Sequence, residues 1–176
     1  MSELGAGRRG APRIVVRTRA VTLHLSGSAA WGTAGCADEA AEVARALIGD
    51  QVSEVMVVLH MDARQGVVGF TEVARGGINR SSVTARDVFL PALAANACSI
   101  ALAHNHPSGS VQPGEADRRC TASLWWAGYY LGVPLLDHVI VCRDSHYSFR
   151  AAGFFKQLEA DGGRCLSCGE ALHPVG

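Results

Sequence analysis

The chain has 176 residues, which is enough for one domain with a buried core and too few for two large domains. Hydrophobic residues make up 48% and charged residues 18%, as in globular chains, and the net charge of zero excludes a general attraction to nucleic acid. No run approaches the roughly 18 apolar residues of a membrane span, and the segment after Met1 lacks the apolar core of a signal peptide. We therefore expect a cytoplasmic protein with reduced cysteines and no membrane contact.

The first 30 residues are predicted to form a basic N-terminal extension that is partly flexible. Within residues 1–20, five arginines stand against a single glutamate. Such a basic segment is more often a solvated chain end, and the alternative is an arm that binds DNA. Within the extension, residues 13–25 alternate in part between apolar and polar, which indicates a strand or a hairpin.

The predicted elements after the extension mix helices with strands. A helix is expected over 38–50, two strands over 54–61 and 66–74, and a helix over 84–97 that starts with a Thr-x-x-Asp capping pattern. A strand over 98–105, a helix over 113–132, and strands over 133–142 and 146–151 follow. Mixed strands and helices around one core predict an α/β fold, with residues 31–155 as its domain and residues 156–176 as a C-terminal tail.

The stretch AHNHPSG at residues 103–109 has the spacing of a metal site. Residues two apart on a strand share a face, so His104 and His106 can direct both imidazoles to one point. Pro113 starts the next predicted helix and places Asp117 in its first turn, where a side chain leans back toward the histidines. Two imidazoles and one carboxylate leave the fourth position of a tetrahedral Zn²⁺ open to water, as in catalytic zinc sites. The alternative is a pair of hydrogen-bonded histidines that end a strand.

These residues resemble the JAMM/MPN metalloprotease signature, which is His-x-His-Pro followed by Asp eleven residues after the second His. The form HNHPSG resembles that of the RadC family, as do EVARGGINRSS (72–82), DVFLPAL (87–93) and GVPLLDHVIV (132–141). The resemblance covers about residues 38–153 and implies the JAMM/MPN fold, a mixed sheet flanked by helices and similar to that of cytidine deaminases. It implies that His104, His106 and Asp117 bind zinc and that Glu72 is the catalytic glutamate.

The chain departs from the family pattern three residues before the zinc aspartate, where the family has a serine and this sequence has Gly114. In JAMM enzymes this serine helps to stabilise the oxyanion, and losing one oxyanion donor can cost about 10²–10³ in rate. The backbone N–H of Gly114 and the hydroxyl of Ser108 are candidate replacements, and Ser81 or Ser82 could also compensate. His138, in the family's Asp-His pair, is a candidate partner that orients a ligand, with a packed strand histidine as the alternative.

Two further features lie outside this motif. Cys165 and Cys168, followed by His173, form one half of a possible second zinc site, with a flexible tail carrying reduced thiols as the alternative. The stretch LWWAGYY at 124–130 holds two aromatic pairs spaced four apart, which we expect to be one core pair and one half-buried pair, with a homodimer interface as the alternative.

Three functions are consistent with the sequence. The first is a zinc-dependent metallopeptidase or isopeptidase, for which the resemblance implies a protein or peptide substrate such as a ubiquitin-like tail. The second is a non-catalytic, zinc-bearing interaction module. The third is a DNA-associated RadC-like protein that uses its arginine-rich N-terminus, although nothing in residues 1–37 resembles the helix-hairpin-helix module of full-size RadC proteins.

Overall fold

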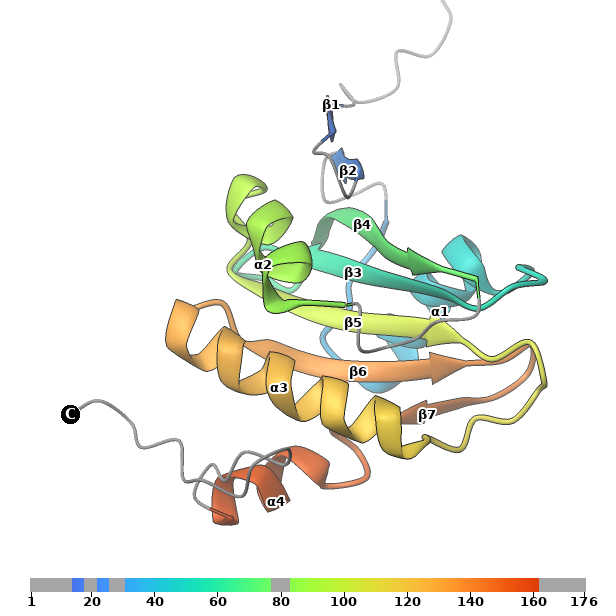
Figure 1. Cartoon of the computed structure of the whole chain (residues 1–176). Coiled ribbons are helices and arrows are strands. Elements are labelled where there is room, and N and C mark those ends of the chain that lie inside the picture. Colours follow the sequence, from blue (N-terminus) through green and yellow to red (C-terminus); the bar gives the residue numbers. More distant parts are fainter. Residues whose placement is uncertain (1–13, 18–21, 26–30, 77–82, 162–176) are drawn as a thin grey trace, which may run out of the picture.

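The computed structural model describes residues 14–17, 22–25, 31–76 and 83–161 (Figure 1). Its centre is a seven-stranded sheet with the order β1-β2-β4-β3-β5-β6-β7. The strands are β1 (Ile14–Arg17), β2 (Thr22–Leu25), β3 (Val55–Met61), β4 (Val67–Arg75), β5 (Ser99–Asn105), β6 (Leu135–Val141) and β7 (His146–Ser148). β5 and β6 are parallel and every other neighbouring pair is antiparallel, so the sheet is mixed.

Helices cover both faces of this sheet. Figure 1 shows α2 (Ala85–Ala94) and α3 (Glu115–Leu131) in front of the sheet and α1 (Ala37–Ile48) behind it. The fourth helix, α4 (Phe154–Ala160), packs beside α3. The predicted α/β class, a mixed sheet flanked by helices as in JAMM/MPN domains, is confirmed.

The alternation of side chains along the central strands creates two cores. On β3, Met56 and Val58 pack with α2 and α3, whereas Val57 and Leu59 pack with α1. Because both faces are covered, β3 and β5 are buried along their whole length and are mostly apolar. Each side chain of these strands therefore faces either the core under α2 and α3 or the core under α1. Which of the two faces a side chain occupies decides which residues can meet in the candidate site.

Most of the expected elements are present, with a few differences. Thr84 and Asp87 form the expected capping box of α2, and Pro91 lies inside that helix. Helix α4 falls across residues that we assigned to the end of the domain and to the tail, and it buries Phe154, Phe155 and Leu158 against the front core. The pattern of the predicted helix over 113–132 places Leu131 on its core face with Cys120 and Leu124, but Leu131 is 47% exposed because α3 ends there at Gly132.

The aromatic pairs of α3 also differ from the prediction. Trp125 and Trp126 are half-buried, while Tyr129 and Tyr130 are 59% and 47% exposed, so neither pair is a core pair. A helix presents only one stripe to the sheet, and Leu124 and Gly128 occupy that stripe here. The arginines at positions 8, 9, 13 and 19 lie outside the described residues. Among the helices that the structure describes, none is both long and apolar enough to cross a bilayer.

Candidate metal centre

The predicted ligands meet where β5 ends and α3 begins. His104 is fully buried within β5, and His106 follows the strand with its side chain 14% exposed. Asp117 lies in the first turn of α3 and is also fully buried. The chain connects β5 to its parallel neighbour β6 through α3, so the carboxyl end of a strand faces the N-terminus of the crossover helix. This edge is where parallel units commonly bind their ligands.

The three donor atoms lie at the spacing expected of ligands to one ion. His104 Nε2 is 3.0 Å from His106 Nε2 and 3.2 Å from Asp117 Oδ1. Two ligands bonded at about 2.0–2.1 Å to a tetrahedral ion are about 3.3 Å apart. The other oxygen of the same carboxylate, Asp117 Oδ2, accepts a hydrogen bond of 2.8 Å from the Gly114 N–H. This bond fixes the carboxylate so that Oδ1 faces His104.

A chain of hydrogen bonds behind His104 determines which of its nitrogens carries the proton. Thr121 Oγ1 donates to the carbonyl of Asp117 at 2.6 Å and also lies 2.6 Å from His138 Nδ1. A hydroxyl has one proton, so His138 Nδ1 must be the donor to Thr121. In a neutral His138, Nε2 is then an acceptor, and it lies 2.8 Å from His104 Nδ1. His104 therefore carries its proton on Nδ1 and presents a lone pair on Nε2.

His106 reaches the same state by a shorter route. Its Nδ1 lies 2.6 Å from the carbonyl oxygen of Ser110, which can only accept, so Nδ1 carries a proton and, in the neutral ring, Nε2 carries the lone pair. The Nε2 lone pairs of His104 and His106 thus face each other across 3.0 Å with a carboxylate beside them. Such an arrangement is stabilised by a positive charge among the three atoms, either a proton shared between them or a metal ion. The donor set therefore fits a metal ion.

Glu54 completes the group, although it was not among the residues that we predicted. Its Oε1 lies 3.9 Å from His104 Nε2 and 3.8 Å from His106 Nε2. Glu54, His104 and His106 offer possible ligand atoms that all lie within 4.8 Å of one another. The register explains the position: Met56 pairs with His104 across antiparallel strands, so two residues further out Glu54 lies opposite His106 on the same face.

Glu72, the predicted catalytic glutamate, does not join this group. In the sheet it pairs with Val57, which pairs with Ala103, and directly opposite residues share a face. Glu72 therefore faces the α1 side, whereas His104 faces the α2 and α3 side. Its carboxylate instead receives two hydrogen bonds of 2.7 Å from the exposed Arg75. This geometry contradicts the placement that we predicted for Glu72, and the glutamate that lies beside His104 and His106 is Glu54.

The remaining predicted residues are placed as follows. The Gly114 N–H is already bonded to Asp117, so it is not the oxyanion donor that we considered. Ser108 is exposed in the loop after β5, where its hydroxyl accepts from the Ser110 N–H at 3.5 Å. His138 lies directly behind His104. Ser81 and Ser82, and the possible second zinc site of Cys165, Cys168 and His173, lie outside the described residues.

Two neighbouring titratable groups have structural roles. The Asp137 carboxylate is buried, which raises its pKa, although it accepts hydrogen bonds from Ser148 Oγ and from the N–H groups of His138 and Arg150. Burial likewise raises the pKa of the Cys142 thiol, which donates to the carbonyl of His106 at 3.5 Å. Through this bond Cys142 supports the main chain of His106, and it is not part of the group of Glu54, His104 and His106.

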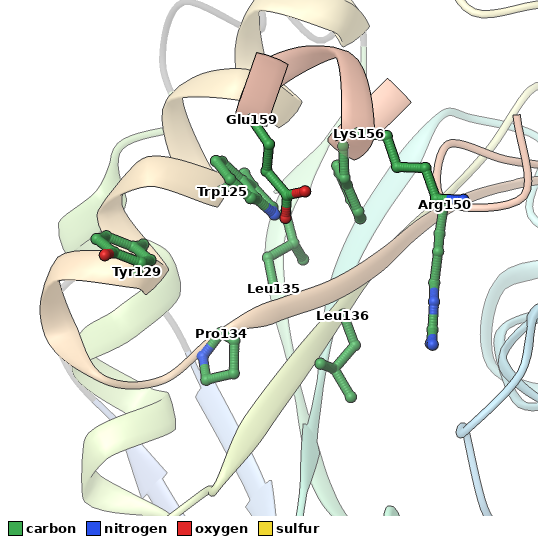
Figure 2. Close-up of a pocket in the computed structure, with 9 residues that line it drawn as sticks. Trp125, Tyr129, Pro134, Leu135, Leu136, Arg150, Lys156 and Glu159 are labelled. Carbon is green, nitrogen blue, oxygen red and sulfur yellow. The ribbon is translucent and has the colours of Figure 1, made fainter. Parts of the chain in front are cut away.

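Two surface hollows lie near these elements. One, of about 400 Å³, adjoins the centre only through His106 and is lined by residues 49–52, 105–107, 109 and 141–143. The other, of about 440 Å³, lies among α3, α4 and the start of β6 (Figure 2). Its lining includes Trp125, Leu135 and Phe155 with charged Lys156 and Glu159, and it shares no residue with the metal group.

The fold and the site define a class: a mixed α/β domain with two histidines and a carboxylate that could hold a metal at the end of its parallel unit. The chain matches the RadC-like JAB domain family over residues 35–154 and belongs to it. Similar proteins include UPF0758 proteins of Burkholderia ambifaria (strain MC40-6) and Burkholderia vietnamiensis (strain G4), each 44% identical over 110 residues. A UPF0758 protein of Paraburkholderia xenovorans (strain LB400) is 42% identical over 110 residues.

The matched region covers 62% of this chain but only 43–44% of these relatives. The chain therefore spans less than half the length of the relatives that it matches. Their names state no activity, so the similarity shows the family and leaves the reaction to be argued from the site.

Proposed function

We propose that the chain is a zinc-dependent hydrolase that cleaves peptide or isopeptide bonds, with Glu54 as its general base and acid. The observation that carries the proposal is the convergence of His104 Nε2, His106 Nε2 and Asp117 Oδ1 on one point, with a second carboxylate beside them. Zinc held by these three atoms would keep one position open and lower the pKa of a water there toward about 7.

The distances favour different roles for the two carboxylates. Asp117 Oδ1 lies 3.2 Å from His104 Nε2, which suits a ligand, whereas Glu54 Oε1 lies 3.8–3.9 Å from the two histidines. Glu54 is also 19% exposed, so it is accessible from solvent and from a substrate. A carboxylate in this position can accept a proton from the attacking water and deliver it to the leaving amine nitrogen.

The other residues orient the reacting groups. His138 and Thr121 hold His104 in the tautomer with a free Nε2, and the carbonyl of Ser110 does the same for His106. A protein or peptide substrate, including a ubiquitin-like tail, is the class that we propose.

The test compares two matched substitutions, Glu54→Gln and Glu72→Gln. The first keeps the shape of the side chain and removes the base, so turnover should fall about 10²–10⁴-fold. The second removes an exposed ion pair on the other face of the sheet, so turnover should stay within about fivefold of the wild type. Hydrolysis would be followed with zinc-loaded protein and a panel of peptide and isopeptide substrates.

Metal content separates the binding and catalytic parts of the proposal. We expect about one zinc per chain in the wild type and in both glutamine variants, and loss of this zinc in His104→Ala. An unchanged stoichiometry in His104→Ala would refute the site. An active Glu54→Gln variant would leave the site in place and remove Glu54 from the mechanism.

A non-catalytic zinc-bearing module is the second candidate, and the absence of the family serine at Gly114 favours it. This candidate predicts the same zinc stoichiometry with no turnover in the wild type. It also predicts that Glu54→Gln has no functional consequence.

A further inference from the structure

We infer that Asn105, which lies between the two histidines in the sequence, is a positioning residue that holds Glu54 against the metal ligands. The inference rests on the proposed function, because it assigns a partner to the proposed general base. Asn105 is only 3% exposed and alternates with its neighbours on β5, so it faces away from the donor atoms of His104. It is therefore not a ligand, and its burial requires another explanation.

All the hydrogen-bonding groups of this amide are used on one segment. Asn105 Oδ1 accepts from the Val55 N–H at 2.7 Å, while Nδ2 donates to the carbonyls of Gln51 and Ser53, each at 3.1 Å. The opposite orientation of the amide would set its N–H₂ against the Val55 N–H, so the backbone partners determine the assignment. The segment bound in this way is 51–55, which carries Glu54.

The bonds fall immediately on both sides of Glu54. Ser53 precedes it and Val55 follows it, and Asn105 holds both. The carbonyl of Glu54 itself accepts from the Gly76 N–H of the neighbouring chain segment at 2.9 Å. Hydrogen bonds thus hold the main chain around Glu54 to Asn105 of β5 on one side and to Gly76, just after β4, on the other. They fix the backbone position from which the Glu54 side chain extends.

This connection is needed because the ladder between β3 and β5 ends one residue earlier. The paired residues run from Met61 and Ser99 to Met56 and His104, and Val55 and Glu54 lie beyond the last pair. The side chain of Asn105 replaces the next backbone bond. A single residue type suits the position, because only an amide of this length offers one acceptor and two donors.

The expected consequence is specific to the geometry of Glu54. Asn105→Ala should leave the three metal ligands in place, so zinc content should equal that of the wild type. Turnover should fall about 10²-fold with KM little changed, because a displacement of about 1 Å in a reacting group has an effect of this size. Gln157→Ala, an exposed amide substitution on α4, is the matched control and should alter neither quantity.

The decisive readout is spectroscopic and does not need a substrate. Cobalt(II) would replace zinc, and its d–d absorption would be recorded for the wild type, Glu54→Gln, Asn105→Ala and the double variant. We expect Glu54→Gln and Asn105→Ala each to alter the spectrum. We expect the double variant to match Glu54→Gln, because Asn105 acts only through Glu54. A further change in the double variant, or an unaltered spectrum in Asn105→Ala, would overturn the inference.

Hydrogen exchange of the metal-free protein distinguishes this failure from that of the proposed function. Asn105→Ala should speed exchange of the Val55 N–H at least about fivefold, and unchanged exchange in the folded variant would overturn the inference alone. A wild type that binds no metal would overturn the proposed function. If Asn105→Ala does not fold, the wild type still provides a test. A scalar coupling across the hydrogen bond from the Val55 N–H to the side-chain carbonyl of Asn105 supports the inference, and its absence refutes it.

Discussion

Lowering the pH should destabilise the fold through His60, a histidine far along β3 from the metal group. Its side chain is fully buried, Nε2 lies 2.8 Å from Thr71 Oγ1, and Nδ1 is buried with no hydrogen-bond partner among the described residues. A proton added to Nδ1 would have no acceptor and would place a charge in the core. Burial accordingly lowers the pKa of His60 from 6.5 to about 4.

The sign and the size of the effect follow from this difference. Between about pH 6.5 and about pH 4 the unfolded chain binds a proton at His60 and the folded chain does not, so the free energy of unfolding falls as the pH falls. At 1.36 kcal/mol for each pKa unit, the full loss is roughly 3 kcal/mol. Above about pH 6.5 the contribution is complete and constant.

Urea unfolding of the metal-free protein, followed by tryptophan fluorescence across this pH range, measures the effect. His60→Gln is the comparison, because glutamine retains a donor for Thr71 and does not titrate. Asp137, whose pKa is raised by burial, contributes in the opposite direction, but it is common to both proteins and cancels in their difference. The wild type should lose roughly 3 kcal/mol more than the variant on acidification. Equal pH dependence in the two proteins would refute the reasoning.

Two further predictions concern the metal centre. Gly114→Ser should fold normally, because Gly114 has φ −78° and an added Cβ would meet only Asp117 Oδ2 at 3.4 Å. The new hydroxyl restores a donor, so any hydrolytic kcat should rise by up to about 10²-fold. No gain in a steady-state assay would show that the chain has another oxyanion arrangement. His138→Phe should keep the stacking on Phe149 but remove the hydrogen-bond acceptor for His104 Nδ1. Zinc affinity, measured by competition with a chelator, should therefore fall about 10–100-fold. An unchanged affinity would contradict the assignment of the His104 proton to Nδ1.

Local patterns were sufficient to predict most of the fold. The long apolar runs of β3 and β5 and the capping pattern at Thr84 indicate their elements without any knowledge of the sheet order. Helix α4 was missed because it has only seven residues, and Phe154, Phe155 and Leu158 alone do not establish a helical period. The exposed end of α3 was missed because the burial of Leu131 depends on where the neighbouring elements stop.

The candidate metal centre also combines residues that sequence spacing predicts with one residue whose position depends on strand pairing. His104, His106 and Asp117 lie within one strand–loop–helix unit, so their spacing in the sequence already determines that they meet. Glu54 enters from a strand that is antiparallel to β5, some fifty positions earlier, and only the pairing of Met56 with His104 brings it there. A signal did exist, because a carboxylate directly before a buried strand reaches the end of whichever antiparallel neighbour it pairs with.

Glu54 and Glu72 differ in the face of the sheet on which their side chains lie, and not in their distance across the sheet. Glu72 lies on β4 and Glu54 directly before β3, and these two strands are immediate neighbours. Each step along a strand reverses the face, so a carboxylate in the register of Ala103 faces α1, while one in the register of His106 can reach the donors. Assigning a catalytic residue on a sheet that is covered on both sides therefore requires the register as well as the strand. In this chain that register is extended to the segment of Glu54 by the side chain of Asn105, which accepts from the Val55 N–H and lies between His104 and His106 in the sequence.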